Sequence, residues 1–261
     1  ALVLFAEDNP VNCKVICMML ERLGIAVETV NNGNDAWTRI RRQPYGMLIT
    51  DCHMPEMDGY ELAEKVRTLE RANERPHMPI IALTADALIG TKERCRAAGM
   101  DDYLPKPVDR ATLNEMIQRW LPKAVQLRRP AMTDDHTTPR NGPFGDDAIL
   151  DLRYIHDAVG GDETMVAPLL EDYIRNARRL VDDMLDAFED RDFVRAREAA
   201  HAAKGTSRLA GAVRFANLCE QIELFLCAGD TSRAAEYSRR IEPELAVVSQ
   251  AVAGHDRRSI S

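Results

Sequence analysis

Short apolar runs and longer amphipathic segments alternate along the first 121 residues. The apolar runs lie at 2–5, 25–30, 46–50, 79–83 and 101–104. The amphipathic segments, in which apolar residues recur every three or four positions, lie at 11–23, 34–41, 59–69, 87–98 and 110–121. Apolar runs of this kind are typical of strands buried on both faces of a parallel sheet, and the segments between them fit crossover helices. The pattern predicts an α/β domain over residues 1–121, with a five-stranded, parallel, doubly wound sheet.

The second half of the chain has a helical pattern nearly throughout. Apolar residues recur at helical spacing from residue 147 to 253, with interruptions at Gly160–Gly161, near Asp190, at Gly211 and at Gly229. We therefore predict an all-α four-helix bundle over residues 147–255 and a short tail over 256–261. A polar stretch with Pro122, Pro130, Pro139 and Pro143 separates the two halves and has neither period, so we interpret residues 122–146 as a flexible linker.

The composition excludes several classes of protein. Of the 261 residues 45% are hydrophobic, which is enough to form a core and excludes a largely disordered chain. A formal net charge of -8 argues against binding to nucleic acid or to an anionic membrane, and we expect neither contact. The six cysteines form no CxxC pair, which is typical of a reducing compartment, so we expect a cytoplasmic location. Because the sequence lacks an initiator Met and begins within a predicted strand, we expect it to be a piece of a longer protein.

Polar and charged residues follow four of the five predicted strands. Glu7 and Asp8 follow the first strand, Asp51 the third and Thr84 the fourth, and the fifth leads into Lys106. The carboxyl ends of parallel strands meet at one edge of the sheet, so these side chains should converge there. Three crowded carboxylates repel one another unless a cation lies among them, and oxygen ligands favour Mg²⁺. A phosphoryl group between the metal ion and the lysine is the expected occupant.

The segments around these residues resemble the receiver domain of response regulators. The matching segments are AEDN at 6–9, TDCHMPEMDG at 50–59, ALTA at 82–85 and YLPKP at 103–107. The resemblance covers residues 2–121 and implies a flavodoxin-like fold. It also implies that Asp51 accepts a phosphoryl group from a phosphohistidine.

The same resemblance implies roles for the neighbouring residues. Mg²⁺ would be held by Glu7, Asp8, Asp51 and the backbone carbonyl of His53. Lys106 would pair with one phosphoryl oxygen and Thr84 would hydrogen-bond another. Tyr103 matches the aromatic residue that turns inward when Thr84 moves.

One histidine in the helical half has a distinctive setting. In the segment AAHAAKGTS at 199–207, His201, Lys204 and Gly205 are spaced so that they share one helix face, which Arg197 and Arg208 extend with positive charge. Phe193, Val194, Ala200 and Ala203 are expected on the other side, so His201 should face solvent. A glycine within a helix costs about 1 kcal/mol relative to alanine, which suggests a close approach by another molecule at Gly205.

This segment resembles a histidine-containing phosphotransfer (HPt) domain, whose signature is a histidine followed by lysine three and glycine four positions later. The resemblance covers residues 147–254. It implies that His201 is a phosphoacceptor, that Lys204 counters the phosphate charge and that Gly205 leaves room for a receiver. Helix geometry suggests that Arg197 and Arg208 complement the acidic rim of that receiver.

Taken together, the chain reads as the carboxyl-terminal receiver and HPt portion of a bacterial hybrid sensor histidine kinase. The phosphoryl group is expected to pass from a kinase histidine to Asp51, then to His201, then to a downstream response regulator. The upstream kinase domain is expected in the same polypeptide, an ATP-dependent protein-histidine kinase, and this portion is expected in the cytoplasm. Whether the parent protein is a sensor kinase anchored in the inner membrane stays open at this point. No ATP-binding glycine-rich motif occurs in this sequence.

Two alternatives stay open at this point. In the first, the receiver is a phosphorylation-dependent docking switch and the helical domain is a scaffold. In the second, the pocket is a Mg²⁺-dependent phosphohydrolase. Phosphohydrolases of the haloacid dehalogenase type need a second acid two residues after the nucleophile, and His53 at that position counts against this class.

Overall fold

The structure is a computed structural model that describes residues 2–73, 75–84, 89–121 and 149–259, without the side chains of 89–91 and 256–259. The predicted linker at 122–146 lies outside the described residues. The chain divides into two compact units that meet in the sequence between residues 137 and 138. The domain limits at 1–121 and 147–255 remain predictions.

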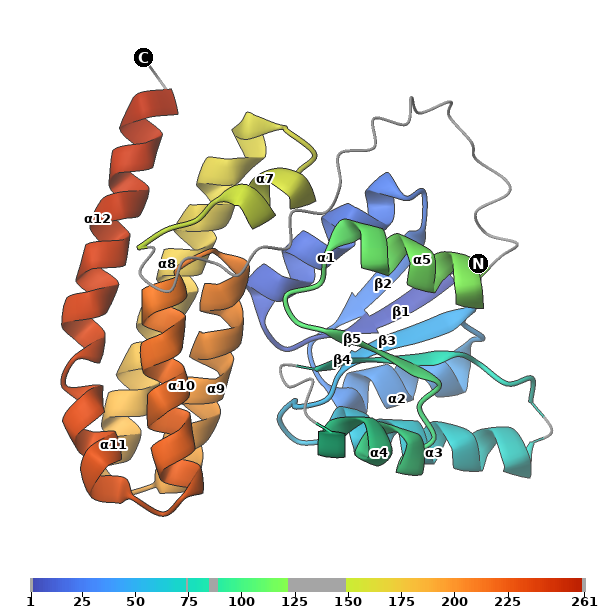
Figure 1. Ribbon diagram of the computed structural model, residues 1–261. Coiled ribbons are helices and arrows are strands. Elements are labelled where there is room, and N and C mark those ends of the chain that lie inside the picture. The colour runs from blue at the N-terminus through green and yellow to red at the C-terminus, as the bar shows by residue number, and fades with distance from the viewer. Residues whose placement is uncertain (1, 74, 85–88, 122–148, 260–261) are drawn as a thin grey trace. The chain divides into compact units, whose positions relative to one another are not determined.

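The first unit is a parallel sheet covered by helices on both faces. Its five strands are β1 (Leu2–Ala6), β2 (Ala26–Val30), β3 (Met47–Asp51), β4 (Ile80–Thr84) and β5 (Asp102–Pro105), in the order β2-β1-β3-β4-β5. The helices are α1 (Pro10–Arg22), α2 (Gly33–Arg42), α3 (Gly59–Ala72), α4 (Ile89–Ala97) and α5 (Arg110–Trp120). Helices α1 and α5 lie on one face of the sheet, and α2, α3 and α4 lie on the other (Figure 1). The predicted doubly wound fold is therefore confirmed.

The position of each strand in the sheet explains its residue pattern. Strands β3 and β4 are buried at every residue, whereas β2 at the edge of the sheet is buried only at Val30. Four side chains in the loops that follow β1, β2, β3 and β5 cap the next helix. Asn9, Asn32, Asp58 and Asp109 each accept a backbone N–H from the first turn of α1, α2, α3 and α5, respectively. These caps begin each helix close to the strand end that precedes it.

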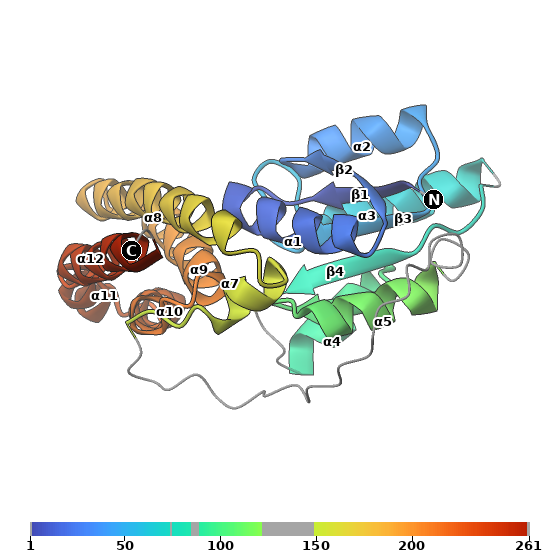
Figure 2. The same ribbon diagram turned by 90° about the horizontal axis from the view of Figure 1, so that it is seen from above.

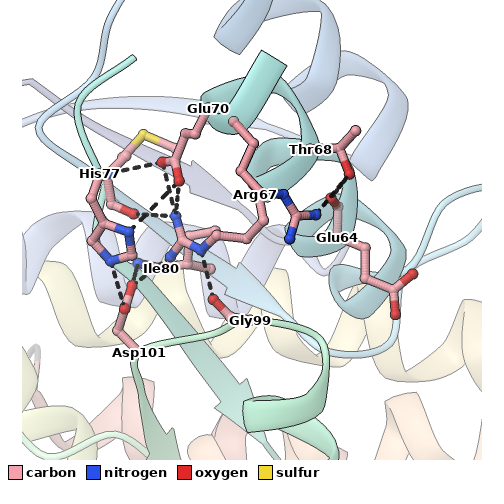
Figure 3. Close-up of polar contacts among 10 residues, drawn as sticks. Glu64, Arg67, Thr68, Glu70, His77, Ile80, Gly99 and Asp101 are labelled. Carbon is pink, nitrogen blue, oxygen red and sulfur yellow. Dashed lines mark hydrogen bonds and ion pairs between the residues drawn. The ribbon is translucent and has the colours of Figure 1, made fainter. Parts of the chain in front are cut away.

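A charged cluster ties α3 to the opposite, amino-terminal ends of β4 and β5 (Figure 3). The Arg67 guanidinium lies 2.8 Å from a Glu70 carboxylate oxygen and 2.6 Å from an Asp101 oxygen. It also donates to the backbone carbonyls of Gly99 and Met78 at 2.8 and 3.0 Å. Asp101 in turn accepts the backbone N–H of Ile80 at 2.7 Å. Arg67 therefore serves as a common partner for three segments that are distant in the sequence.

The second unit is a helical bundle. Its elements are α7 (Arg153–Ala158), the 3₁₀ turn η1 (Glu163–Met165), α8 (Val166–Glu189), α9 (Phe193–Leu209), α10 (Val213–Cys227), α11 (Thr231–Ser238) and α12 (Ile241–Ser259). Figure 2 looks nearly along the long helices α8, α9, α10 and α12, which form the bundle. Tyr173 of α8 is fully buried among them and its hydroxyl lies 3.1 Å from Ser207 Oγ of α9. The all-α prediction is confirmed.

The breaks between these helices follow the predicted glycines, with two differences. Gly161, Gly211 and Gly229 have left-handed backbone angles, and a Cβ at Gly211 would lie 1.8 Å from the carbonyl oxygen of Asp151. The break between α11 and α12 was not predicted, because residues 239 and 240 are both arginine and carry no turn signal. Helix α12 extends to Ser259, so residues 256–259 of the predicted tail are helical.

Among the residues that the structure describes, no helix combines the length and the apolar character needed to cross a membrane.

Candidate functional site

The predicted acidic residues meet at the carboxyl edge of the sheet. Glu7 follows β1 and is 1% exposed, and Asp51 ends the neighbouring strand β3 and is 8% exposed. Asp8 lies beside them and is exposed to solvent. One carboxylate oxygen from each of the three lies within 4.8 Å of the other two. The structure therefore brings together three of the four predicted metal ligands, with Asp8 open to solvent.

Lys106 joins the two buried carboxylates. Its Nζ lies 2.8 Å from Oε2 of Glu7 and 2.7 Å from Oδ2 of Asp51. The backbone N–H of Lys106 donates to the carbonyl of Thr84 at 2.7 Å, which holds the loop after β5 against the end of β4. Burial lowers the pKa of the lysine, but the Asp51 and Glu7 carboxylates outweigh this effect and raise it above its ordinary value. The ammonium is therefore charged and lies between the two carboxyl groups.

The donor set fits a hard divalent cation such as Mg²⁺. Burial, the largest cause, raises the pKa of Glu7 to about 8; the Lys106 ammonium opposes this rise and the Asp51 carboxylate adds to it. Asn12 donates to the other Glu7 oxygen at 2.9 Å. A cation among the three carboxylates would stabilise the ionised form of Glu7, and carboxylate oxygens are the ligands that Mg²⁺ prefers.

The remaining predicted residues of the first unit are Thr84, Tyr103 and His53. Thr84 is buried at the end of β4, and Tyr103 of β5 is partly buried against the core cluster on the same side as Tyr60. His53 is exposed, and its backbone N–H lies 3.3 Å from Oδ1 of Asp51. The metal contact of the His53 carbonyl and the switching of Thr84 and Tyr103 remain predictions.

Gly59 is a site residue to which sequence reasoning gave no role. A Cβ at this position would lie 2.1 Å from the carbonyl oxygen of Asp51. The Gly59 N–H also donates to the carbonyl of Cys52 at 3.2 Å. Only glycine therefore allows α3 to begin so close to the phosphoacceptor candidate. In the sequence, Gly59 could have been found from its position directly after Asp58, the residue that caps α3.

In the second unit, the side chain of Glu223 holds His201. The Nδ1 atom of His201 on α9 lies 2.7 Å from Oε1 of Glu223 on α10. This contact fixes the orientation of the ring and makes Nε2, on the opposite edge, the candidate reactive nitrogen. The His201 side chain, which was predicted to face solvent, is 25% exposed and so is partly open to solvent. Sequence reasoning missed Glu223, because nothing near it in the sequence marks a partner for a residue on another helix.

Lys204 does not share the exposed face that was predicted for it. Its side chain is 3% exposed, and its Nζ lies 2.7 Å from Oε2 of Glu223. The lysine therefore pairs with the carboxylate that holds His201, from inside the bundle. The residue pattern of α9 also misled at Val194, which was placed on the buried side but is 60% exposed. Helical spacing gives angles around one helix, but the neighbouring helices decide which of those angles are covered.

The predicted docking residues lie around His201. Arg197 is exposed, and Arg208 lies 2.8 Å from a Glu220 oxygen with 29% of its side chain exposed. A Cβ at Gly205 would meet no atom of the described residues within 4 Å. Packing within the bundle therefore does not require this glycine, which leaves approach by another molecule as its explanation. The docking roles of Arg197, Gly205 and Arg208 remain predictions.

The contacts of Glu223 with His201 and Lys204 should make the free energy of unfolding of the second unit depend on pH. Burial acts to raise the pKa of Glu223, but His201 and Lys204 outweigh it and lower the pKa to about 2. The pKa of Glu223 in the folded protein lies below its ordinary value of 4.5. The stabilisation from ionised Glu223 is therefore complete above pH 4.5 and is lost as the pH falls through about 2. Its size is about 3 kcal/mol.

This dependence is measurable by urea unfolding of the full chain between pH 5 and pH 2. Trp37 and Trp120 both lie in the first unit, so tryptophan fluorescence follows the unfolding of that unit. Circular dichroism also detects the unfolding of the helical second unit. Glu223→Gln should flatten the acid dependence of the helical transition. Glu220→Gln, on the same helix, should not. Equal acid dependence in wild type and Glu223→Gln would contradict the prediction.

Comparisons with known proteins agree with this geometry. Residues 3–118 match the family model of the response regulator receiver domain, and residues 168–251 match that of the Hpt domain. The signal transduction histidine-protein kinase BarA of Escherichia coli is 29% identical over 252 residues, which are 93% of this chain and 25% of that protein. The virulence sensor protein BvgS of Bordetella pertussis is 34% identical over 219 residues, or 80% of this chain and 17% of that protein. The chain thus spans about a quarter or less of the length of these relatives.

Solved structures match the first unit. The receiver domain of sensor histidine kinase PA1611 from Pseudomonas aeruginosa, with a magnesium ion in its active site cleft, is 45% identical. The match covers 46% of this chain and 95% of that chain, with a TM-score of 0.42. A chain of the co-crystal structure of the Saccharomyces cerevisiae histidine phosphotransfer signaling protein Ypd1 with the receiver domain of Ssk1 is also among the matches. It is 28% identical, with 46% of this chain and 87% of that chain covered and a TM-score of 0.43. The two predicted resemblances are confirmed by the family models: residues 3–118 belong to the receiver domain family and residues 168–251 to the Hpt domain family, so the chain joins two domains of phosphorelay signalling and is related to sensor histidine kinases.

Proposed function

We propose that this chain carries a phosphoryl group through two of its own residues, Asp51 and His201. The group comes from a phosphohistidine of a kinase domain and leaves to an aspartate of a separate response regulator. The observation that supports this most directly is the pairing of the Lys106 ammonium with both Asp51 and Glu7 in a buried pocket. Such a pocket offers a nucleophile and charge compensation at one place.

The first transfer would take place at Asp51. A carboxylate oxygen of Asp51 attacks the phosphorus, the P–N bond to the donor imidazole breaks, and its electron pair returns to that ring. Lys106 shifts from the carboxylates to a phosphoryl oxygen, and the Thr84 hydroxyl donates to another. When bound by Glu7, Asp8 and Asp51, Mg²⁺ supplies charge neutralisation for the phosphoryl oxygens. The backbone N–H of His53 and the Lys106 ammonium keep the carboxylate of Asp51 in place before the attack.

The second transfer would take place at His201. Its Nε2 attacks the phosphorus of the acyl phosphate, the P–O bond breaks, and the electron pair returns to the Asp51 carboxylate. The proton on Nδ1 stays in the hydrogen bond to Glu223, which stabilises the positive ring that forms. Lys204 keeps Glu223 ionised, and Arg197 and Arg208 are placed to meet the acidic rim of a receiver. Lys204 therefore acts through Glu223 and does not contact the phosphate.

The partners follow from the direction of transfer. The upstream donor is the kinase domain of a hybrid sensor histidine kinase to which this portion belongs, and the acceptor is a response regulator receiver. The relatives named as sensor proteins and histidine kinases support this assignment. The six cysteines are free, which supports a reducing compartment and hence a place in the bacterial cytoplasm.

A labelling time course tests the proposed function. The full chain is incubated with a small phosphodonor and Mg²⁺, and acyl phosphate, which is labile in base, is separated from phosphohistidine, which is labile in acid. We expect acyl phosphate to appear first and phosphohistidine to follow at its expense. A purified receiver domain added afterwards should remove the histidine label. Acyl phosphate without any later phosphohistidine would instead favour the docking switch, and rapid release of inorganic phosphate from phosphomonoesters would favour the hydrolase.

A further inference from the structure

Two histidines and a glutamate meet in the second unit, on elements that take no part in the His201 cluster. His156 lies on α7, Glu163 on η1 and His255 near the end of α12. One ring nitrogen from each histidine and one carboxylate oxygen lie within 4.8 Å of one another. Helix α7 and the carboxyl-terminal part of α12 can be found at the same end of the bundle in Figure 1. Residues far apart in the sequence thus present three metal-ligating atoms at one point.

The three side chains already face one another closely. Nδ1 of His156 lies 2.9 Å from Oε1 of Glu163. The rings of His156 and His255 have centroids 6.2 Å apart and meet edge to face. In a tetrahedral zinc site with bonds of about 2.0–2.2 Å, neighbouring ligand atoms lie roughly 3.3–3.6 Å apart. Small side-chain rotations therefore suffice to bring the three atoms onto one ion.

We propose that His156, Glu163 and His255 bind a transition-metal ion of the Zn²⁺ type. Two neutral imidazoles with one carboxylate form a ligand set that such ions prefer, whereas Mg²⁺ and Ca²⁺ prefer oxygen ligands alone. The side chains of His156 and Glu163 are 33% and 60% exposed, so an ion can enter from solvent and keep water as its fourth ligand. This site differs in chemistry from the all-carboxylate pocket at Glu7, Asp8 and Asp51.

The consequence of such a site is a cross-link between the start and the end of the bundle. Helix α7 is short, and only Ile155 and Ala158 are buried in it, so its docking depends on few contacts. An ion shared with α12 would close a long loop of chain and so stabilise the folded arrangement of these segments. Because His201, Lys204 and Glu223 are not among the ligands, the ion would act on stability and leave the phosphoacceptor cluster unchanged.

Binding of Zn²⁺ to the metal-free full chain tests the site. Titration is followed by NMR of the histidine rings and by thermal unfolding with circular dichroism. We expect the ring signals of His156 and His255, and not that of His201, to shift with one equivalent of Zn²⁺. We also expect the midpoint of the helical transition to rise and to fall back with a chelator. Mg²⁺ at the same concentration should shift neither ring.

Variants separate this site from other zinc-binding groups of the chain. His255→Ala should weaken Zn²⁺ binding at this point by roughly tenfold or more and remove the thermal shift, because a ligand is lost. His77→Ala, which removes an exposed histidine of the first unit, is the matched control. It should keep both the Zn²⁺ affinity and the thermal shift of the wild type. Cobalt-substituted protein should lack the intense absorption of thiolate ligands. Unchanged ring signals for His156 and His255, or an unchanged thermal shift in His255→Ala, would overturn the proposal.

Discussion

Full-length Asp51→Asn protein is expected to take up no phosphoryl label at either acceptor when it is incubated with a small phosphodonor and Mg²⁺. Asparagine keeps the shape of the side chain, but its amide is not a nucleophile and cannot form an acyl phosphate. The label at His201 should also vanish, because the proposed relay reaches His201 only through Asp51. His201→Gln should give the complementary result, with normal acyl phosphate and no phosphohistidine. Acid- and base-stability assays on the two proteins measure both species.

A matched substitution keeps this result interpretable. Asp58→Asn changes another acid that follows the same strand, but it preserves the cap of α3, since asparagine also accepts a backbone N–H. Asp58→Asn should therefore label like wild type. Full labelling of Asp51→Asn would exclude Asp51 as the acceptor. Phosphohistidine in Asp51→Asn would mean that the phosphodonor labels His201 directly. That result would contradict the transfer from Asp51 to His201.

Arg67→Met is expected to destabilise the first unit by about 3–5 kcal/mol, which is the usual result of removing one partner from a buried ion pair. Glu70 and Asp101 have only 11% and 14% of their side chains exposed, and both would lose their cation. Two backbone carbonyls would lose a donor as well. A domain typically has a stability of roughly 5–15 kcal/mol, so the loss is a large part of the total. Tryptophan fluorescence during urea unfolding reports this unit alone.

Arg71→Met is the control for this experiment. Arg71 lies one turn further along α3 on its exposed side, where its guanidinium donates to Thr68 Oγ1 at 3.4 Å. Its replacement should change the stability by less than about 0.5 kcal/mol, as is usual for surface positions. A similar small change for Arg67→Met would show that the cluster in Figure 3 contributes little.

Much of the candidate site was predictable because it depends on local order along the chain. The apolar runs place Glu7, Asp51, Thr84 and Lys106 after their strands, and parallel pairing brings all strand ends to one edge. The convergence of Lys106 with Glu7 and Asp51 follows from topology without any knowledge of side-chain contacts. The same holds for Gly211, whose left-handed backbone angle ends α9 where glycine predicts a break.

Other features needed the packed structure. The burial of Lys204 and the exposure of Val194 depend on where α8 and α10 lie against α9, which helical spacing cannot give. The break between α11 and α12 at residues 239 and 240 contains no glycine or proline. In the last turn of α12, nothing in the residue pattern distinguishes a helix from a tail. In these places tertiary contacts decide, and local sequence preference is weak.

The sequence by itself determined the two folds, the order of the domains, the strand-end pocket and His201 as the histidine to consider. These properties depend on periodicity and chain order, which the sequence carries directly. Only the tertiary structure decided that Glu223 holds His201, that Arg67 joins Glu70 with Asp101, and that His156, Glu163 and His255 meet. The physical reason is the same in each case: an ion pair or a ligand set needs atoms within a few ångströms, and between separate helices or loops that distance is fixed by packing rather than by spacing along the chain.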